Sequence, residues 1–348
     1  MMDDSRSNIP VPVKLIFLGT AAAAWAYAIQ QKRRMEFAGK VVVISGASRG
    51  LGLELARGFA REKANIALLA RDQERLTESA VELTNYGIRV LALPCDVSRQ
   101  EQVRSSVAAI VREFGAIDVL INNAGTIQVG PSEHMDLEDY ARAMAVHFWG
   151  PLYLMQEVIP QMKSQRHGRI VNIASIGGKV AVPHLLPYVA SKFALVGLSQ
   201  GMRTELAKDG IHVTTVSPGL MRTGSHFNAF FKGKQKMEFA LFSIANASPL
   251  LSTSSAHAAK EIIEACRYGK SQLVITPQAR LLRLVNSLFP SLVAETMSLV
   301  CRLLPGARDG RGDIPRRGWE SQSAVAPSLL TERADRAAAR NREQLQSS

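Results

Sequence analysis

Cysteine is scarce in this chain, and its few thiols form none of the spaced pairs that mark a disulfide framework or a zinc site. The 348 residues contain three cysteines, Cys95, Cys266 and Cys301. An odd number of distant thiols fits free, unreactive side chains in a reducing compartment. Zinc-finger spacings and arginine/aromatic RNA-binding motifs are also missing, which argues against a nucleic-acid partner.

A hydrophobic segment of full membrane-spanning length is missing as well. Leu15–Ile29 has fifteen residues without a charge, whereas a spanning helix needs about 20. The charges of Lys32, Arg33 and Arg34 follow this segment instead of leading it, which disfavours a secretory signal. Two interpretations stay open: a marginal membrane anchor, and a helix that packs on the domain. We expect the protein at the cytoplasmic face of a membrane, or in the cytoplasm.

Acidic residues are outnumbered, with 30 Asp and Glu against 42 Lys and Arg and a net charge of +12. Part of the excess follows the apolar N-terminal segment, and part lies in the last forty residues. Basic charge beside apolar sequence favours an anionic membrane surface as a partner.

From Lys40 onward, short β-branched runs alternate with longer amphipathic segments such as Asp72–Asn85 and Ser98–Phe114. Continuous apolar strands are buried on both faces, which predicts a parallel sheet. Right-handed crossovers then give a doubly wound α/β fold with its ligand crevice at the carboxyl ends of the strands. Seven strands are expected: Lys40–Ser45, Asn65–Ala70, Ile88–Leu93, Ile117–Ile121, Gly168–Ala174, Ile211–Val216 and Gln272–Ile275.

The pattern predicts one domain, residues 38–277, between two apolar extensions. Residues 1–37 form the N-terminal segment, and residues 278–304 form amphipathic helices that lie on a membrane, cover a pocket, or pack on the domain. Residues 305–348 are rich in Arg, Ala, Ser and Gly, a composition typical of a disordered tail.

A glycine-rich turn follows the first strand, with the sequence Gly46-Ala47-Ser48-Arg49-Gly50-Leu51-Gly52 before a helix. Gly46 and Gly50 permit a tight turn, and Gly52 lets the helix pack close to the strand. The helix N-terminus offers unpaired N–H groups to a pyrophosphate. This interpretation requires that no side chain fills the space over Gly46–Gly52. A glycine-rich turn without a ligand is the alternative.

The second strand ends in Ala70-Arg71, where an NAD site has an acidic residue for the ribose 2′-hydroxyl. Arg71 and Arg49 can instead bind a 2′-phosphate through charge-assisted hydrogen bonds. The sequence therefore predicts NADP(H) in preference to NAD(H).

The spacing GxxxGxG, with Asn122-Asn123-Ala124-Gly125 and with Tyr188 and Lys192 in the segment YVASK, resembles the short-chain dehydrogenase/reductase family over residues 38–275. The resemblance implies a Rossmann core, nicotinamide hydride transfer between an alcohol and a carbonyl, and a homodimer or homotetramer. It also implies cofactor contacts at Asp96 and Val97 for the adenine, at Asn123, Ala124 and Gly125, and at Pro218, Gly219 and Thr223 for the nicotinamide end.

Tyr188 and Lys192 are four residues apart, which places both on one face of a helix. A nearby ammonium lowers the pKa of a phenol, so we expect Tyr188 to be the proton donor and Lys192 to tune its pKa and hold the nicotinamide ribose. Ser175 ends the strand before them and can bond to the substrate oxygen.

His147 stands where the family usually has an asparagine that supports a water leading from the lysine to solvent. A histidine can take part in such a proton relay, or it can be a satisfied core residue. The sequence leaves both alternatives open.

The resemblance also implies that the segment after Thr223, about residues 224–251, is the substrate lid. It contains Phe227, Phe230, Phe231, Phe239 and Phe242, which favours a hydrophobic or lipid-like ketone or alcohol. Alternatively, these rings pack the lid onto the domain, and Lys232, Lys234 and Lys236 either meet an acidic head group or are solvated. A dinucleotide-sensing or membrane-scaffold protein with the same fold is the competing function.

Overall fold

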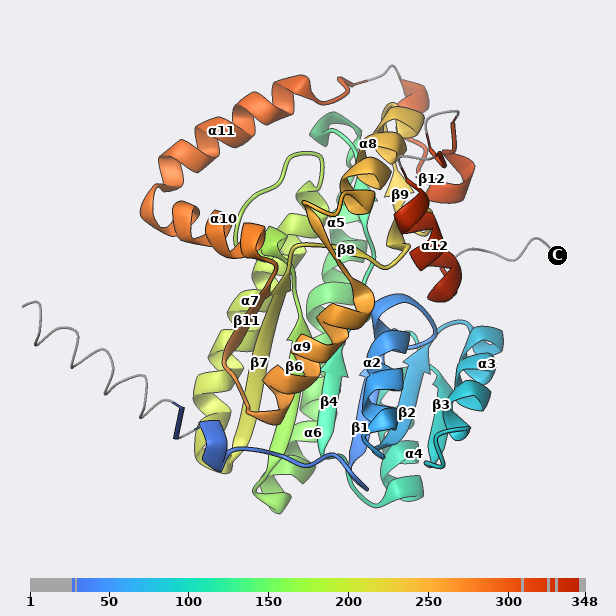
Figure 1. Cartoon of the computed structure of the whole chain (residues 1–348), viewed down its shortest axis with the longest axis vertical. Helices are drawn as coiled ribbons and strands as arrows, with labels where there is room; N and C mark the ends of the chain where they lie inside the picture. The colour runs from blue at the N-terminus through green and yellow to red at the C-terminus, as the bar shows by residue number, and fades with distance from the viewer. Residues whose placement is uncertain (1–26, 29, 308–309, 324–325, 329–330, 344–348) are drawn as a thin grey trace, which may run out of the picture.

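The computed structural model describes residues 27–28, 30–307, 310–323, 326–328 and 331–343. Its centre is a parallel sheet of seven strands in the order β11-β7-β6-β4-β1-β2-β3, as the sequence predicts (Figure 1). The reversal of strand order between β1 and β4 opens a crevice at the carboxyl ends of the strands. The strands are β1 Val41–Ser45, β2 Asn65–Ala70, β3 Val90–Pro94, β4 Val119–Asn122, β6 Gly168–Ile173, β7 Ile211–Pro218 and β11 Gln272–Ile275.

Two hydrophobic layers hold the helices on the sheet, because successive side chains of a strand point to opposite faces. Val42 and Ile44 of β1 face one layer, and Val41 and Val43 face the other. The first layer is covered by α2 Gly50–Arg61, α3 Gln73–Thr84 and α9 Ser255–Arg267. The second is covered by α4 Gln100–Phe114, α6 Gly150–Gln165 and α7 Leu186–Leu206.

A cap of smaller elements lies above the carboxyl ends of the strands (Figure 1). Its helices are α5 Leu137–Met144, which continues through the π-helical turn η2 Ala145–Trp149, and α8 Gln235–Ala247. Its short strands form two small sheets, β5-β9-β12 and β8-β10. These strands are β5 Gln128–Val129, β8 Leu220–Arg222, β9 Phe230–Phe231, β10 Ser252–Ser254 and β12 Arg316–Arg317.

The lid phenylalanines pack mainly on one another. Phe227, Phe231 and Phe239 are buried, and the Phe231 and Phe239 rings meet edge to face at 5.5 Å. Phe242 packs against the same cluster, and Phe230 lies under the Arg317 guanidinium at 3.7 Å. Of the two expectations for these rings, packing of the lid is therefore the one observed.

Lys232 differs from both expectations for the lid lysines. It is 1% exposed, and its ammonium lies 3.0 Å from Asp136 and 2.6 Å from Asp139. This ion-pair network joins the lid to the start of α5, whereas Lys234 and Lys236 are exposed. The sequence could not distinguish the buried lysine from its neighbours because its carboxylate partners lie about a hundred residues earlier.

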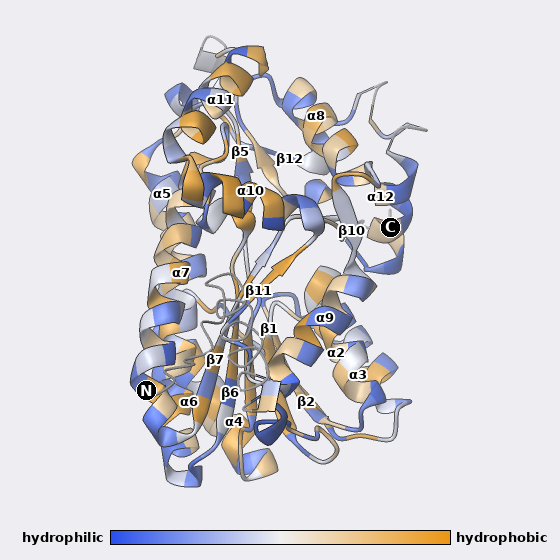
Figure 2. Cartoon of the chain, turned by 60° about the vertical axis from the view of Figure 1, so that its left-hand side comes forward, coloured by the Kyte–Doolittle hydropathy of each residue, from blue (hydrophilic) through white to orange (hydrophobic). Residues whose placement is uncertain are grey.

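Residues 278–304 form a helical hairpin of α10 Pro277–Leu288 and α11 Pro290–Leu303. It projects from the end of β11, at the same end of the sheet as the lid (Figure 1). Hydrophobic residues line both helices among polar ones (Figure 2), and only Ala279 and Val293 are buried. The exposed apolar side chains are Leu281, Leu284, Leu288, Phe289, Leu292, Leu299, Val300 and Leu303.

The prediction that residues 305–348 are disordered is wrong for the described residues after the hairpin. β12 pairs with the lid strand β9, and a final helix, α12 Glu332–Arg340, packs on α8 and β8. Ala334 and Ala338 are fully buried in this contact. The arginine- and alanine-rich composition suggested disorder, yet small alanines on one helix face allow the close packing seen here.

The proposed anchor Leu15–Ile29 lies outside the described residues except for residues 27–28. These two residues are helical, as are residues 30–32 after the anchor. Within the described part of the chain, none of the helices has both the length and the apolar character that crossing a bilayer requires.

Candidate active site

The glycine turn between β1 and α2 has the backbone geometry that the sequence predicts. Gly46 and Gly50 have φ of +66° and +60°, in the left-handed region that favours glycine. A Cβ on Gly52 would lie 2.1 Å from the carbonyl oxygen of Gly46, so only glycine lets the helix start this close to the strand. Leu51 points into the core, which leaves its backbone N–H as the group that can face a phosphate.

The space over this turn is not free. The carbonyl oxygen of Asn341 accepts a hydrogen bond from the Gly50 N–H at 2.9 Å. A Cβ on Gly50 would lie 2.5 Å from the Glu343 carboxylate, which also pairs with Arg49 at 3.3 Å. The requirement for an open surface over Gly46–Gly52 is therefore not met, because the C-terminal segment folds back onto it.

The residues expected at the adenosine end form a basic cluster. Arg71 is exposed at the end of β2. Burial lowers the pKa of Arg49, and the nearby charges of Arg75 and Arg71 lower it further against the opposing effect of Glu343. Arg75, which sequence reasoning missed, pairs with Asp72 at 3.2 Å in the first turn of α3. Three guanidinium groups thus lie around the end of β2.

The remaining predicted adenosine contacts lie at the ends of β1 and β3. The side chain of Ser48 is buried, and its carbonyl oxygen accepts a hydrogen bond from Ser79. The carboxylate of Asp96 accepts bonds from the N–H and hydroxyl of Ser98. These bonds outweigh the desolvation of Asp96 and lower its pKa. Val97 packs against Gly150.

The segment after β4 holds the glycine turn in place through hydrogen bonds. The Asn123 amide donates to the carbonyl oxygens of Ser45 and Gly46 at 3.1 and 3.0 Å. The backbone N–H groups of Asn123 and Ala124 donate to the Ser45 hydroxyl. Gly125 is exposed and lies against the ring of His147. Ser45 serves here as the acceptor that holds β4 to β1.

The predicted nicotinamide end follows β7. Pro218 ends that strand, and a Cβ on Gly219 would lie 2.8 Å from the Thr276 hydroxyl. The Thr223 hydroxyl accepts the Ser225 N–H, and its carbonyl oxygen accepts the side-chain amide of Asn341 at 3.1 Å. The C-terminal segment therefore contacts both the glycine turn and the Thr223 segment.

Ser175, Tyr188 and Lys192 meet at the carboxyl end of β6. Ser175 follows that strand, and Tyr188 and Lys192 lie one turn apart on α7. A Cβ on Gly177 would lie 3.4 Å from the Ser175 hydroxyl and 3.5 Å from the Tyr188 ring. The Lys192 ammonium is 5.6 Å from the centre of that ring and donates to the carbonyl oxygen of Ile173 at 2.8 Å.

The expected direction of the Tyr188 pKa is not observed. Burial raises the pKa of Tyr188, and its hydrogen bond with Ser175 only partly offsets this effect. Burial also lowers the pKa of Lys192 to about 7. Desolvation is the largest effect on Tyr188, so it decides the direction in which the pKa of the phenol moves.

His147 lies fully buried in the π-helical turn, edge to face with Tyr188. The Thr126 N–H donates to its Nε2 at 3.1 Å, and its Nδ1 lies 2.7 Å from the Ser191 hydroxyl. Burial and the charge of Lys192 lower the pKa of His147 well below 6.5. Both ring nitrogens have partners and the ring is neutral, which favours the satisfied core histidine over the relay.

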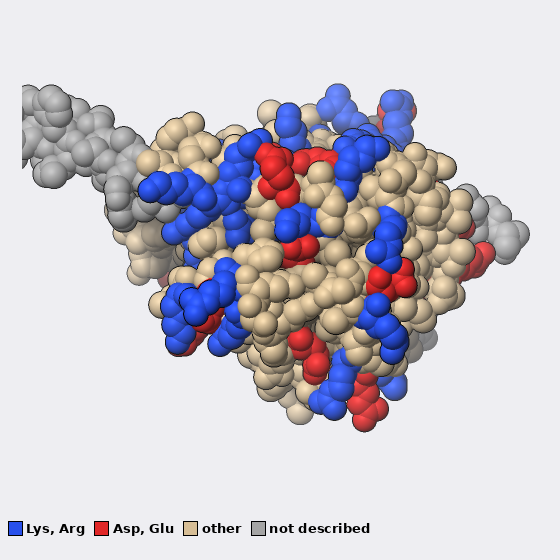
Figure 3. All heavy atoms as spheres, turned by 90° about the horizontal axis from the view of Figure 1, so that it is seen from below, with Lys and Arg blue, Asp and Glu red and all other residues tan. Residues whose placement is uncertain are grey.

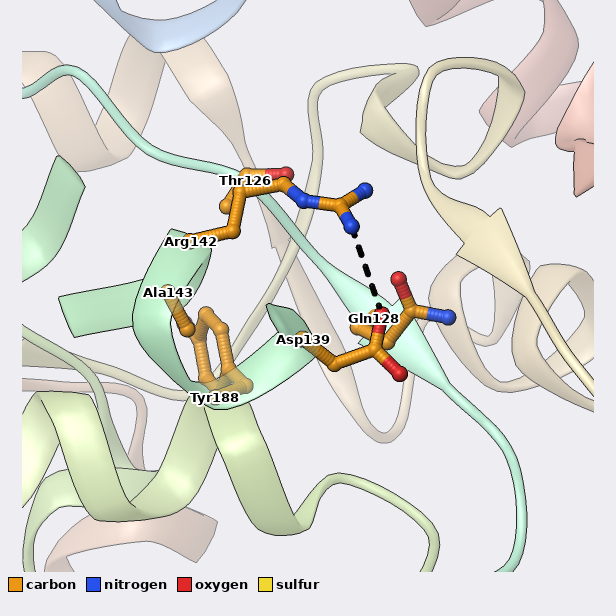
Figure 4. A pocket seen from close by; sticks show the side chains of 6 residues that line it. All are labelled: Thr126, Gln128, Asp139, Arg142, Ala143 and Tyr188. Carbon is orange, nitrogen blue, oxygen red and sulfur yellow. Dashed lines mark ion pairs between the residues drawn. The ribbon is translucent and has the colours of Figure 1, made fainter. Parts of the chain in front are cut away.

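A small pocket opens against the Tyr188 ring, with a cavity volume of about 10 Å³, roughly the room for one water molecule. Polar side chains line it beside the Tyr188 ring and Ala143 (Figure 4). Arg142 and Asp139 of α5 lie 3.7 Å apart there. The amide nitrogen of Gln128 is buried and has no hydrogen-bond partner among the described residues. Sequence reasoning missed these residues because no motif links β5 and α5 to the tyrosine.

Comparison with known proteins gives consistent matches. A family model described as short chain dehydrogenase matches residues 40–230. Dehydrogenase/reductase SDR family member 7B of Danio rerio is 32% identical over 80% of this chain and 91% of its own length. The L-sorbose reductase of Gluconobacter frateurii, solved with NADPH and L-sorbose, is 30% identical, with a TM-score of 0.63 over 69% of this chain and 97% of its own. An NAD⁺-bound xylitol dehydrogenase is 27% identical, with a TM-score of 0.61 over 69% and 99%.

Proposed function

Because this chain belongs to the short-chain dehydrogenase/reductase family, we propose that it is an NADP(H)-dependent oxidoreductase that interconverts a carbonyl and an alcohol on a hydrophobic substrate. The observation that carries the proposal is the convergence of Ser175, Tyr188 and Lys192 at the carboxyl end of β6. Oxidoreductase chemistry with a nicotinamide dinucleotide follows from the family, and the choice of NADP(H) and of substrate is the proposed part.

The residues around the crevice fit a dinucleotide once the C-terminal segment has moved. Gly46, Gly50 and Gly52 provide a surface without side chains at the N-terminus of α2. Arg49, Arg71 and Arg75 would hold a 2′-phosphate, which supports NADP(H). When bound, the nicotinamide supplies or accepts the hydride at the substrate carbon.

Side chains of the protein donate the proton and bind the substrate oxygen. In the reductive direction the Tyr188 hydroxyl gives its proton to the carbonyl oxygen, and the C=O bond becomes an alcohol. The raised pKa of Tyr188 keeps the phenol protonated before this step. Ser175, beside that hydroxyl, donates a second hydrogen bond to the same oxygen. Lys192, fixed by the Ile173 carbonyl, holds the nicotinamide ribose and interacts most strongly with the phenolate when it is charged.

Two surfaces support a substrate with a large apolar part and a polar end. The α10–α11 hairpin presents exposed leucines at the carboxyl end of the sheet, where the crevice lies. The pocket beside Tyr188 presents the Gln128 amide and the Arg142 guanidinium, which donate hydrogen bonds to an oxygen-bearing substituent. The apolar part would lie toward the hairpin, and the polar end would lie against these two donors.

An anionic membrane surface is the proposed source of such a substrate. Arg280, Arg283 and Arg302 lie among the exposed apolar residues of the hairpin, the combination that favours binding at a lipid interface. At the opposite end of the molecule, basic side chains gather on one side of the surface, with acidic ones interspersed elsewhere (Figure 3). Lys32 and Arg34, which precede the domain, are exposed.

The test is an assay of the purified chain for NADPH and NADH oxidation with ketones of increasing chain length, and for the reverse reaction with the matching alcohols. Each ketone is supplied with and without a second hydroxyl or carboxylate at the far end of the chain. We expect efficiency to rise with apolar length and NADPH to be preferred. Absence of turnover with every ketone and alcohol would contradict the enzymatic function and favour the dinucleotide-sensing alternative.

A further inference from the structure

The C-terminal segment, residues 332–343, reaches the glycine turn through a set of specific polar contacts. Asn341 is fully buried and bridges three elements. Its carbonyl oxygen accepts the Gly50 N–H, and its side-chain amide donates to the Thr223 carbonyl and to the Ser255 hydroxyl at 3.1 and 3.0 Å. These contacts span the gap between the turn after β1 and the segment after β7, where the cofactor's phosphates would lie.

Glu343 brings a negative charge to the same place. Its carboxylate is buried, pairs with Arg49 at 3.3 Å, and accepts a hydrogen bond from the Asn228 amide. A Cβ on Gly50 would meet this carboxylate at 2.5 Å. Burial raises the pKa of Glu343 although Arg49 and Arg75 oppose the effect. A carboxylate beside a helix N-terminus and a guanidinium satisfies the same donors that a phosphate would use.

Further contacts hold the segment before and between Asn341 and Glu343. Before them, Arg340 pairs with Glu54 of α2 at 3.2 Å, and Ala338 lies so close that a Cβ on Gly224 would be 2.4 Å from its Cα. Between them, Arg342 pairs with Glu82 of α3 at 2.8 Å, and its carbonyl oxygen accepts a hydrogen bond from Arg75. The segment thus engages Arg49 and Arg75, two of the three arginines proposed for the 2′-phosphate.

We propose that residues 332–343 are an autoinhibitory segment that occupies the pyrophosphate part of the dinucleotide site. This inference rests on the proposed cofactor site. The segment and the dinucleotide cannot bind at once, because the Asn341 carbonyl and the Glu343 carboxylate occupy the surface over Gly50. The cofactor therefore binds only the fraction of molecules in which the segment is released, and its apparent affinity falls by that fraction.

The experiment measures NADPH binding to the full-length chain by isothermal titration calorimetry. The test variant is the double substitution Asn341→Ala, Glu343→Ala, which removes the side-chain contacts with Thr223, Ser255, Arg49 and Asn228. The matched control is the double substitution Glu332→Ala, Arg336→Ala, which removes an exposed ion pair on the outer face of α12. Hydrogen exchange of residues 332–343 is followed with and without NADPH in all three proteins.

We expect the test variant to bind NADPH at least about tenfold more tightly than the unchanged chain, and the control variant to bind as the unchanged chain does. NADPH should also speed hydrogen exchange in residues 332–343 of the unchanged chain. Equal or weaker binding by the test variant, or slower exchange with NADPH, would show that the segment belongs to the bound state and would overturn the inference. If neither NADPH nor NADH binds even the test variant, the proposed cofactor site itself fails.

Discussion

The imidazole of His147 and the hydroxyl of Ser191 lie 2.7 Å apart in the buried interior beside the candidate active site. His147 accepts the Thr126 N–H on its other nitrogen, and Ser191 donates to the Tyr188 carbonyl oxygen at 2.8 Å. Because Ser191 precedes Lys192 on α7, this chain of hydrogen bonds joins the wall of the pocket to the helix that carries both Tyr188 and Lys192. His147 is therefore a positioning residue in this structure.

Replacement of His147 by asparagine separates positioning from proton relay. Since burial holds the pKa of His147 well below 6.5, the ring stays neutral through the working pH range. We expect His147→Asn to lower kcat by about tenfold through a misplaced α7, without moving the pH profile of kcat. The double substitution His147→Asn, Ser191→Ala should lower kcat little further. The control His257→Asn, at an exposed site, should leave kcat unchanged. A shifted pH profile of kcat in His147→Asn would instead favour a proton-relay role for His147.

Lys192 is predicted to give the stability of the folded chain a specific pH dependence. Burial lowers its pKa from 10.5 to about 7, so between these values the unfolded chain holds a proton that the folded chain has released. The free energy of unfolding therefore rises with pH across this window, by at most about 1.4 kcal/mol per pH unit. Lys192→Met should remove this slope and raise stability near pH 7.

The slope is measured from urea unfolding midpoints between about pH 6.5 and 9.5, compared between the unchanged chain, Lys192→Met and Lys208→Met. The exposed Lys208 is the control, and its variant should keep the slope of the unchanged chain. If Lys192→Met keeps the slope too, the buried ammonium is not its source.

Local sequence predicted the parts of the site that depend on local geometry. Gly46, Gly50 and Gly52 are spaced by the turn itself, and Tyr188 and Lys192 share a helix face because they are four residues apart. The seven strands of the sheet were predictable as well, because each is a continuous apolar run in the local sequence. Such patterns are independent of distant residues, so they can be recognised in one sequence.

Contacts between distant segments were beyond the reach of these patterns. Asn341 meets Gly50 across almost the whole chain, and the alanine-rich sequence around it is helical because Ala334 and Ala338 pack on the lid. Lys232 looked like a surface lysine, and its buried pairing with Asp139 depends on how the lid folds. The raised pKa of Tyr188 has a similar origin, since desolvation depends on the complete surroundings of the ring.

Cofactor preference is predicted to depend on the arginines at the end of β2. Arg71→Asp should lower the ratio of kcat/KM for NADPH to that for NADH by at least about tenfold, because a 2′-phosphate loses a charge-assisted hydrogen bond and meets a carboxylate instead. Arg112→Asp, on the exposed surface of α4, makes the same change of charge away from the crevice. An unchanged ratio for Arg71→Asp would place the 2′-phosphate elsewhere.

Membrane binding is predicted to depend on the α10–α11 hairpin. Leu284 and Leu292 are exposed, and burying a leucine side chain contributes about 1.5–3 kcal/mol. The double substitution Leu284→Asp, Leu292→Asp should therefore reduce the fraction of protein that floats with anionic phospholipid vesicles by more than about tenfold. Leu137→Asp, at another exposed leucine, should leave flotation unchanged.

Flotation is measured both for the full-length chain and after removal of residues 1–26, so that a contribution from the N-terminal segment is separated from that of the hairpin. If, without residues 1–26, the hairpin variant floats as well as the chain with the unchanged hairpin, α10 and α11 have no lipid-binding role.

The proposed activity depends most on proton transfer from the Tyr188 hydroxyl to the substrate oxygen. The most direct measurement compares kcat and NADPH binding between the unchanged chain, Tyr188→Phe and the control Tyr153→Phe in α6, whose ring stacks on Trp149 of η2. We predict that Tyr188→Phe lowers kcat by about 10²–10⁴-fold, with NADPH binding nearly unchanged, and that the control keeps both. Turnover by Tyr188→Phe at the rate of the unchanged chain would contradict the account.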